Sequence, residues 1–228
     1  LERLIKMLNV SDGELVVEAK AIYSTEKFLI SRHLMYWQVY LHKTVVSAEQ
    51  LLIKILQRAK ELARKGEKLF ASPSLSFFLN RAINIEEFRC VDASPDCPLE
   101  HFAQLTDSDV DCAISVWAKH SDRILSALCQ SLLSRKLFRV EMSSIPFSKE
   151  RISLEKQKVL QSLSISENNL DYFVTHTDVS NKAYEKNDNP IKILFNNGDL
   201  KDVTEVSDIL GSVAFSKITR KFILCYPK

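Results

Sequence analysis

The side chains best suited to chemistry in this sequence are cationic and phenolic, and they recur along one early stretch. Arg32, Tyr36, Tyr40 and Lys43 follow one another at intervals of three or four residues. At about 100° per residue, they fall within a sector of roughly 80° on one side of a helix. Guanidinium and ammonium groups bind phosphate, and phenols suit hydroxyl-bearing ligands. The pattern predicts a phosphate-binding face, with a solvated or interdomain helix face as the alternative.

Other kinds of chemistry find little support in the spacing. None of the five histidines is followed by Asp or belongs to an H-E-x-x-H pair, and His33 and His42 point to different sides of one helix. The four glycines form neither G-x-G-x-x-G nor G-K-[ST], which excludes glycine-rich phosphate loops, and no G-x-S-x-G is present. We therefore predict no catalytic residue and no metal ligand within this sequence.

The composition is that of an ordinary globular protein. Hydrophobic residues make up 46% of the chain, charged residues 26%, and the net charge is only +2. This balance gives no support to a nucleic-acid or membrane partner, and no apolar run reaches the roughly 18 residues of a membrane span. Five cysteines without a C-x-x-C pair argue against a disulfide framework and a zinc knuckle. A cytoplasmic location is predicted from this cysteine pattern.

The elements that must position the polar face begin with a hairpin. Residues Leu4 to Val10 and Glu14 to Lys20 read as two strands joined by an Asp12-Gly13 turn, because this dipeptide tolerates positive φ. From Ile22 to about Lys65 there is neither Pro nor Gly, and Gly66 stands where a left-handed C-cap belongs. This stretch predicts one long helix or two helices in line.

An apolar stripe runs along the same predicted helix. Its positions are Ile30, Leu34, Trp37, Leu41, Val45, Ala48 and Leu52. Spacings of three and four residues are typical of one buried helical face. We therefore expect the Trp37 side to anchor the protein interior, with the Arg32 side opposite to it.

The remaining chain predicts an α+β fold in two parts. Residues 1–135 are expected to be mostly helical after the opening hairpin, and residues 136–228 to form a small α+β domain of split βαβ type. N-cap residues and apolar periodicity predict helices over 73–82, 110–119, 124–135 and 149–163. Alternation and turn residues predict strands over 137–142, 172–177, 191–195, 200–206 and 222–226.

The segment from Arg32 to Lys43, RHLMYWQVYLHK, resembles the helix that follows the HD core in deoxynucleotide triphosphohydrolases of the HD superfamily. Three further stretches resemble this family in the same order, and the likeness is nearer to bacterial members. These stretches are Leu105-Thr106-Asp107, Arg135 to Phe138, and Glu185-Lys186-Asn187 ahead of Pro190. The resemblance identifies the chain as the C-terminal portion of such a phosphohydrolase.

The resemblance implies roles for individual residues. Arg32 is expected to contact the substrate phosphate, and Tyr40 to pack on or bond to the sugar. Tyr36 also belongs to the substrate face, but it stands where a human member of the family has His. A phenol donates a hydrogen bond and is a poor proton carrier near neutral pH, so an acid role there is in doubt. The positions that match regulatory nucleotide sites between subunits are His42, Lys43 and Lys186.

The resemblance also implies what the intact protein does. A divalent metal would be held by H…HD…D ligands upstream of Leu1, so this piece alone should be inactive. The intact protein would be a homo-oligomer that converts a dNTP to a deoxynucleoside and triphosphate. The alternative is a non-catalytic scaffold, an oligomerisation module or a nucleotide-sensing module. Upstream sequence would discriminate between these readings.

Overall fold

The chain folds into two units whose segments alternate along the sequence. We describe a computed structural model at residues 2–89, 96–163, 165–181, 184, 190–210 and 219–228. Unit 1 comprises Leu1–His42, Met142–Pro146 and Thr177–Ile223, and unit 2 comprises Lys43–Glu141, Phe147–His176 and Leu224–Lys228. Each unit is therefore assembled from segments far apart in sequence. The domain boundary at residue 135 stays a prediction.

Unit 1 is built on a small sheet with strand order β1-β2-β5-β6. Strands β1 and β2 pair antiparallel, as do β5 and β6, and β2 pairs with β5 in parallel. The second hairpin thus joins the first one, an arrangement that the sequence did not predict. The elements are α1 (Glu2–Lys6), β1 (Leu8–Ser11), β2 (Glu14–Glu18), η1 (Ala19–Ala21), α2 (Ile22–Met35), η2 (Tyr36–Tyr40), β5 (Lys192–Leu194), β6 (Leu200–Asp202) and α9 (Val203–Val206).

The opening hairpin is confirmed in part. Its turn has Asp12 and Gly13 at φ values of 52° and 80°, as a tight turn of this type requires. The first strand begins at Leu8, however, because Glu2–Lys6 forms a helical turn in place of extended chain. An ion pair between Lys6 Nζ and Glu2 Oε1, 2.6 Å long, links successive turns of this short helix.

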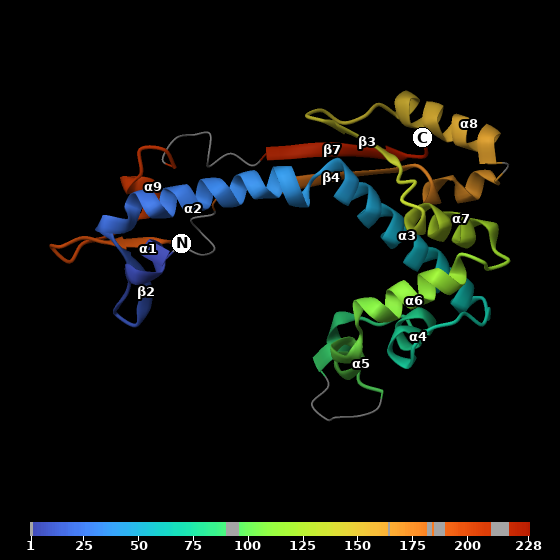
Figure 1. Ribbon diagram of the computed structural model, residues 1–228, viewed down its shortest axis with the longest axis horizontal. Helices are drawn as coiled ribbons and strands as arrows, with labels where there is room; N and C mark the ends of the chain where they lie inside the picture. The colour runs from blue at the N-terminus through green and yellow to red at the C-terminus, as the bar shows by residue number, and fades with distance from the viewer. Residues whose placement is uncertain (1, 90–95, 164, 182–183, 185–189, 211–218) are drawn as a thin grey trace. The chain divides into compact units, whose positions relative to one another are not determined.

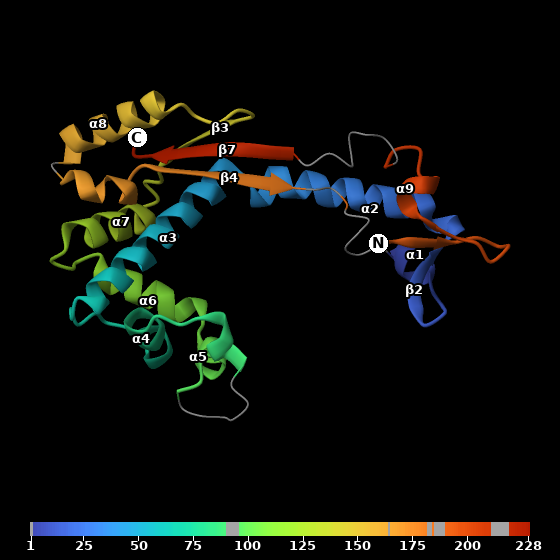
Figure 2. The ribbon, with the colours of Figure 1, turned by 180° about the vertical axis from the view of Figure 1, so that it is seen from behind.

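The core of unit 1 forms where α2 and α9 meet the sheet. Both views show α9 beside the first half of α2 (Figure 1 and Figure 2). A buried Glu26 on α2 accepts a hydrogen bond from the Ser207 hydroxyl, and Ser207 Oγ accepts one from the Leu210 amide at 2.8 Å. The buried hydrophobic cluster is Val17, Ala21, Leu29, Ile193, Val203 and Leu210.

Unit 2 is mainly helical, and α3 is its central helix, in contact with α4 and α7. The predicted caps are present: Ser72 caps α4, Thr106 and Asp109 form a capping box on α6, and Asp122 caps α7. Gly66, at φ 90°, follows the end of α3 as predicted. The helices are α3 (Lys43–Arg64), α4 (Pro73–Asn80), η3 (Ile85–Arg89), α5 (Pro98–Gln104), α6 (Asp107–Trp117), α7 (Arg123–Leu133), α8 (Lys149–Leu163) and η4 (Glu167–Tyr172).

A second sheet has the strand order β3-β7-β4, and residues of its strands belong to both units. Its strands are β3 (Arg139–Ser143), β4 (Thr175–Asn181) and β7 (Thr219–Tyr226). The last strand in the sequence thus lies between two earlier ones, with α8 connecting β3 towards β4. The predicted α+β fold class, with an N-terminal hairpin, is confirmed.

The predicted apolar stripe does not form the buried face of the helices. Leu34 and Val45 are 47% and 46% exposed, and the other stripe positions are only half-buried. The buried face of α3 lies one residue away, at Ser47, Leu51, Ile55, Ala59 and Leu62. One residue is about 100° on a helical wheel, and the π-helical segment η2 breaks the period on which the single wheel depended. The α3 part of the stripe lines a cavity of about 640 Å³ beside α6.

Two neighbouring leucines test this correction. We expect Leu51→Ala to lower the free energy of unfolding by about 2–5 kcal/mol, because Leu51 is fully buried. Leu52→Ala removes the same atoms from a half-buried position in the predicted stripe, so its loss should be well below that of Leu51→Ala. Urea unfolding followed by circular dichroism measures both. If both variants lost the same free energy of unfolding, the predicted stripe would be part of the buried face after all.

Cys97 is disulfide-bonded, which the cysteine spacing did not predict. A disulfide depends on how the fold brings two Cα atoms together, and the spacing of cysteines in the sequence does not report that distance. Cys112, Cys129 and Cys225 are free thiols. Within the described residues, no helix combines the length and apolarity that crossing a bilayer requires. The cytoplasmic location stays a prediction.

Candidate functional site

Three residues of the predicted polar face, Arg32, Tyr36 and Tyr40, form a short row of contacting side chains in unit 1, whereas Lys43 belongs to unit 2. Cζ of Arg32 lies 5.4 Å from the centroid of the Tyr36 ring. The Tyr36 and Tyr40 rings follow at 5.4 Å between centroids, with an angle of 61° between their planes. Arg32 is exposed, Tyr36 half-buried and Tyr40 51% exposed. We call Arg32, Tyr36 and Tyr40 the cation–phenol ladder.

The two tyrosines of the ladder are the first and last residues of a π-helical segment. The Leu41 amide donates a hydrogen bond to the Tyr36 carbonyl at 2.7 Å, five residues back, so the helix is widened by one residue here. The segment has no buried residue. Single π-helical turns inside helices are frequent at functional sites, because they redirect side chains that a regular helix would leave on another side.

Trp37 lies in the same π-helical segment but does not belong to the ladder, and its side chain is only half-buried. The Lys221 ammonium lies 4.1 Å from the Trp37 ring centroid, and the His33 ring meets Trp37 edge-on at 6.5 Å. Thr25, Glu26 and Leu29 are the buried residues of α2, in place of the predicted Trp37 side. Lys221 was missed from the sequence, since a contact between residues so far apart along the chain leaves no local spacing signal.

The three predicted regulatory residues are not brought together by what the structure describes. His42 and Lys43 are exposed neighbours at the division between the two units. Lys186 lies outside the described residues. Their nucleotide-binding role stays a prediction that follows from the family resemblance.

The chain is similar to known proteins in both sequence and fold. Residues 1–71, which include the cation–phenol ladder, match the family described as HD associated region. A crystal structure of a phosphohydrolase from Bacteroides thetaiotaomicron is 45% identical, with a TM-score of 0.89 over 99% of this chain and 55% of that one. Together these two matches support a relationship to the HD-superfamily phosphohydrolases. This relationship agrees with the resemblance of the sequence to HD phosphohydrolases in general, and it does not identify the substrate.

Two further proteins match all or nearly all of this chain. An uncharacterized protein of Bacillus subtilis, YwfO, is 28% identical over 236 residues, covering 100% of this chain and 50% of its own length. A hypothetical protein from Aquifex aeolicus, 24% identical with a TM-score of 0.58 over 99% of this chain and 47% of that one, shares the fold. The chain thus spans about half the length of the relatives that it matches.

The described residues of this chain do not assemble the ligands of a metal centre. No group of three or more His, Cys, Asp or Glu side chains gathers as an ion would require among residues 2–89, 96–163 and the later described ranges. HD phosphohydrolases are generally metal-dependent, and a metal needs several such ligands converging on one point.

An ionic cluster around Arg58 in unit 2 is structural in character. Arg58 donates to both carboxylate oxygens of Asp122, at 3.1 and 2.6 Å, and to Glu61 at 2.8 Å. Hydrogen bonds from Lys65 and then Tyr172, with Arg58, lower the pKa of Glu61 to about 2. Each carboxylate accepts several hydrogen bonds within the cluster. The arrangement therefore ties α3 to the start of α7 and is not poised for proton transfer.

Proposed function

We propose that the intact protein is a metal-dependent HD phosphohydrolase that hydrolyses a dNTP to a deoxynucleoside and triphosphate. This chain would supply one wall of the nucleotide pocket. The observation that carries the proposal is the exposed cation–phenol ladder, which lies within the matched HD associated region. Its side chains offer an anion contact followed by two ring surfaces, in the order that a phosphate and its sugar require.

Each ladder residue has a physical task in this proposal. The Tyr36 ring lies beneath the Arg32 guanidinium and limits its orientations, and the guanidinium can donate paired hydrogen bonds to phosphate oxygens. Tyr40 presents an exposed ring and hydroxyl, which suit packing against a deoxyribose. The Tyr36 phenol donates a hydrogen bond to the bound ligand and does not act as the proton carrier.

The metal and its ligands would come from outside this chain, so the chain by itself should not hydrolyse nucleotides. Homo-oligomerisation, with His42, Lys43 and Lys186 at nucleotide sites between subunits, belongs to the same proposal. This part of the proposal, the assembly and its regulatory sites, rests on the family resemblance. Specificity for a dNTP requires that the pocket select against the 2′-hydroxyl of a ribonucleotide.

The whole protein tests this proposal. Purified protein is incubated with Mg²⁺ or Mn²⁺ and each dNTP, and the products are separated by ion-exchange chromatography. Equal amounts of deoxynucleoside and triphosphate are expected, and neither should form when EDTA removes the metal. Release of single phosphate or of pyrophosphate would contradict the proposed reaction. Nucleotide binding without any turnover would favour the nucleotide-sensing module in its place.

A further inference from the structure

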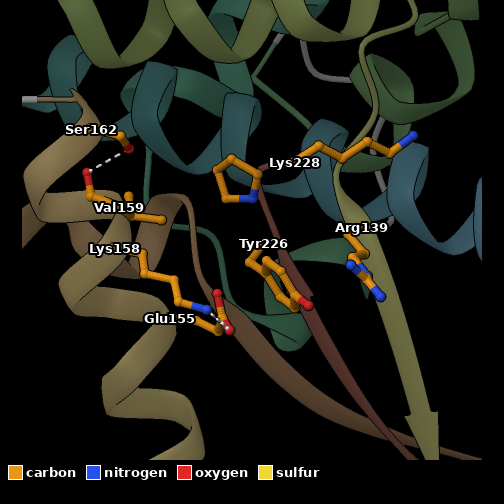
Figure 3. A pocket seen from close by; sticks show the side chains of 8 residues that line it. Arg139, Glu155, Lys158, Val159, Ser162, Tyr226 and Lys228 are labelled. Carbon is orange, nitrogen blue, oxygen red and sulfur yellow. Dashed lines mark hydrogen bonds and ion pairs between the residues drawn. The ribbon is translucent and has the colours of Figure 1, made fainter.

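A cavity of about 660 Å³ lies in unit 2, between α8 and the end of β7. Figure 3 shows Tyr226 at its centre, with Glu155, Lys158, Val159 and Ser162 on the α8 side and Arg139 on the β3 side. Small-molecule sites have volumes of about 300–1,000 Å³, so the cavity can hold a metabolite. It is remote in sequence from the cation–phenol ladder, and the proposed function does not use it.

The two carboxylates at this cavity are already engaged by other groups. Buried Glu155 accepts hydrogen bonds from Arg151 and from Lys158, the latter at 3.0 Å. Glu141 accepts from the Tyr226 hydroxyl and from Arg151, the latter at 3.0 Å. The Tyr226 hydrogen bond is the main cause of the lowered pKa of Glu141. For Glu155, burial raises the pKa, but the bonds from Arg151 and Lys158 outweigh it and the net direction is down.

Positive charge exceeds negative charge around the cavity. Four cationic side chains, those of Arg139, Arg151, Lys158 and Lys228, line it or bond to its lining, against the two carboxylates Glu141 and Glu155. Arg151 lies between the carboxylates, while the Arg139 Nε stays 3.9 Å from Glu141, beyond hydrogen-bond distance. Among these side chains, an excess of two positive charges therefore faces the cavity from β3, α8 and the residues after β7.

The wall between the cations is apolar. Val159 is 4% exposed, and the buried Tyr226 ring and Pro227 complete this part of the lining. We propose that this cavity binds a small phosphate monoester, with its phosphate held by Arg139 and Lys158 and its organic body lying against Tyr226 and Val159. A phosphate monoester has a charge of about −1.5 to −2 at neutral pH, which matches the excess, whereas a single carboxylate would leave half of it uncompensated.

Phenyl phosphate is a suitable probe, because it combines the dianion with a flat apolar body. Calorimetric titration of the whole protein should show it binding at least about tenfold more tightly than inorganic phosphate or phenol, each of which supplies one half of the interaction. Methyl NMR should show the Val159 methyl signals shifting on titration. Because Arg32 is not part of this cavity, Arg32→Ala should leave the phenyl phosphate titration of the Val159 methyl signals unchanged, even if the proposed dNTP hydrolysis fails.

Matched charge variants locate the binding. The double substitution Arg139→Gln and Lys158→Gln should weaken phenyl phosphate binding by about a hundredfold, at roughly tenfold for each lost cation. The double substitution Arg64→Gln and Lys149→Gln removes the same charges from exposed positions outside the cavity lining, and should change affinity by less than about twofold. Equal weakening by both doubles, or Val159 methyl signals that do not move, would overturn the proposal without any reference to nucleotide hydrolysis.

Discussion

Arg32→Ala in the whole protein is expected to lower kcat/KM for a dNTP by about 10²- to 10³-fold, the effect of losing one well-placed donor to a reacting anionic group. The guanidinium lies over the Tyr36 ring, which restricts its orientation before substrate arrives. Loss of a preorganised cation costs more than loss of a mobile one, because little of its binding energy was spent on ordering. Steady-state release of triphosphate measures the effect.

Two companion variants make this result specific. Arg32→Lys keeps the charge but loses the planar fork and its stacking on Tyr36, so its activity should fall between wild type and Arg32→Ala. Lys27→Ala removes an exposed cation from the same helix outside the ladder, and should leave kcat/KM within about twofold of wild type. Wild-type activity of Arg32→Ala would reject the nucleotide-binding role of the ladder.

Arg58→Ala is expected to lower the free energy of unfolding by up to about 3 kcal/mol, because it leaves the largely buried carboxylate of Asp122 without its charged partner. The side chains of Arg58 and Asp122 are 11% and 16% exposed. The Nε and Nη2 atoms of Arg58 donate hydrogen bonds to the two carboxylate oxygens of Asp122, at 3.1 and 2.6 Å. Arg58 also lies over the Tyr172 ring at 5.5 Å, so packing is lost together with charge. Urea unfolding measures the loss.

An exposed ion pair provides the control for Arg58. Lys6 and Glu2 form a 2.6 Å pair, but their side chains are 67% and 82% exposed. Lys6→Ala should therefore change stability by less than about 1 kcal/mol. If Arg58→Ala costs no more than Lys6→Ala, the cluster around Arg58 does not hold α3 to α7.

Features set by neighbouring residues were predictable from the sequence. The caps at Thr106 and Asp122 and the turn at Asp12-Gly13 depend on side chains within a few residues of one another. The ladder of Arg32, Tyr36 and Tyr40 is equally local, since residues four apart meet on any helix. For this reason helix ends, turns and the contacts within the ladder could be predicted without knowledge of long-range contacts.

Features set by distant residues were not predictable. The buried face of α3 depends on where α4 and α7 lie, and the π-helical segment shifts the helical phase by an amount that apolar spacing alone does not encode. The contact of Lys221 with Trp37 joins segments far apart in the chain. The cations of the phosphate monoester cavity come from β3, α8 and the residues after β7, so no short motif records them.

The parallel pairing of β2 with β5 has a consequence for synthesis on the ribosome. Val17 lies opposite Ile193 and Glu18 opposite Leu194, so the first hairpin cannot complete its sheet until nearly the whole chain has emerged. Pairings between such distant residues slow folding, and an unpaired strand edge invites association with other chains while it waits. Until then Val16 and Val17, which point to opposite faces of β2 and are buried in the folded chain, stay exposed to solvent and to chaperones.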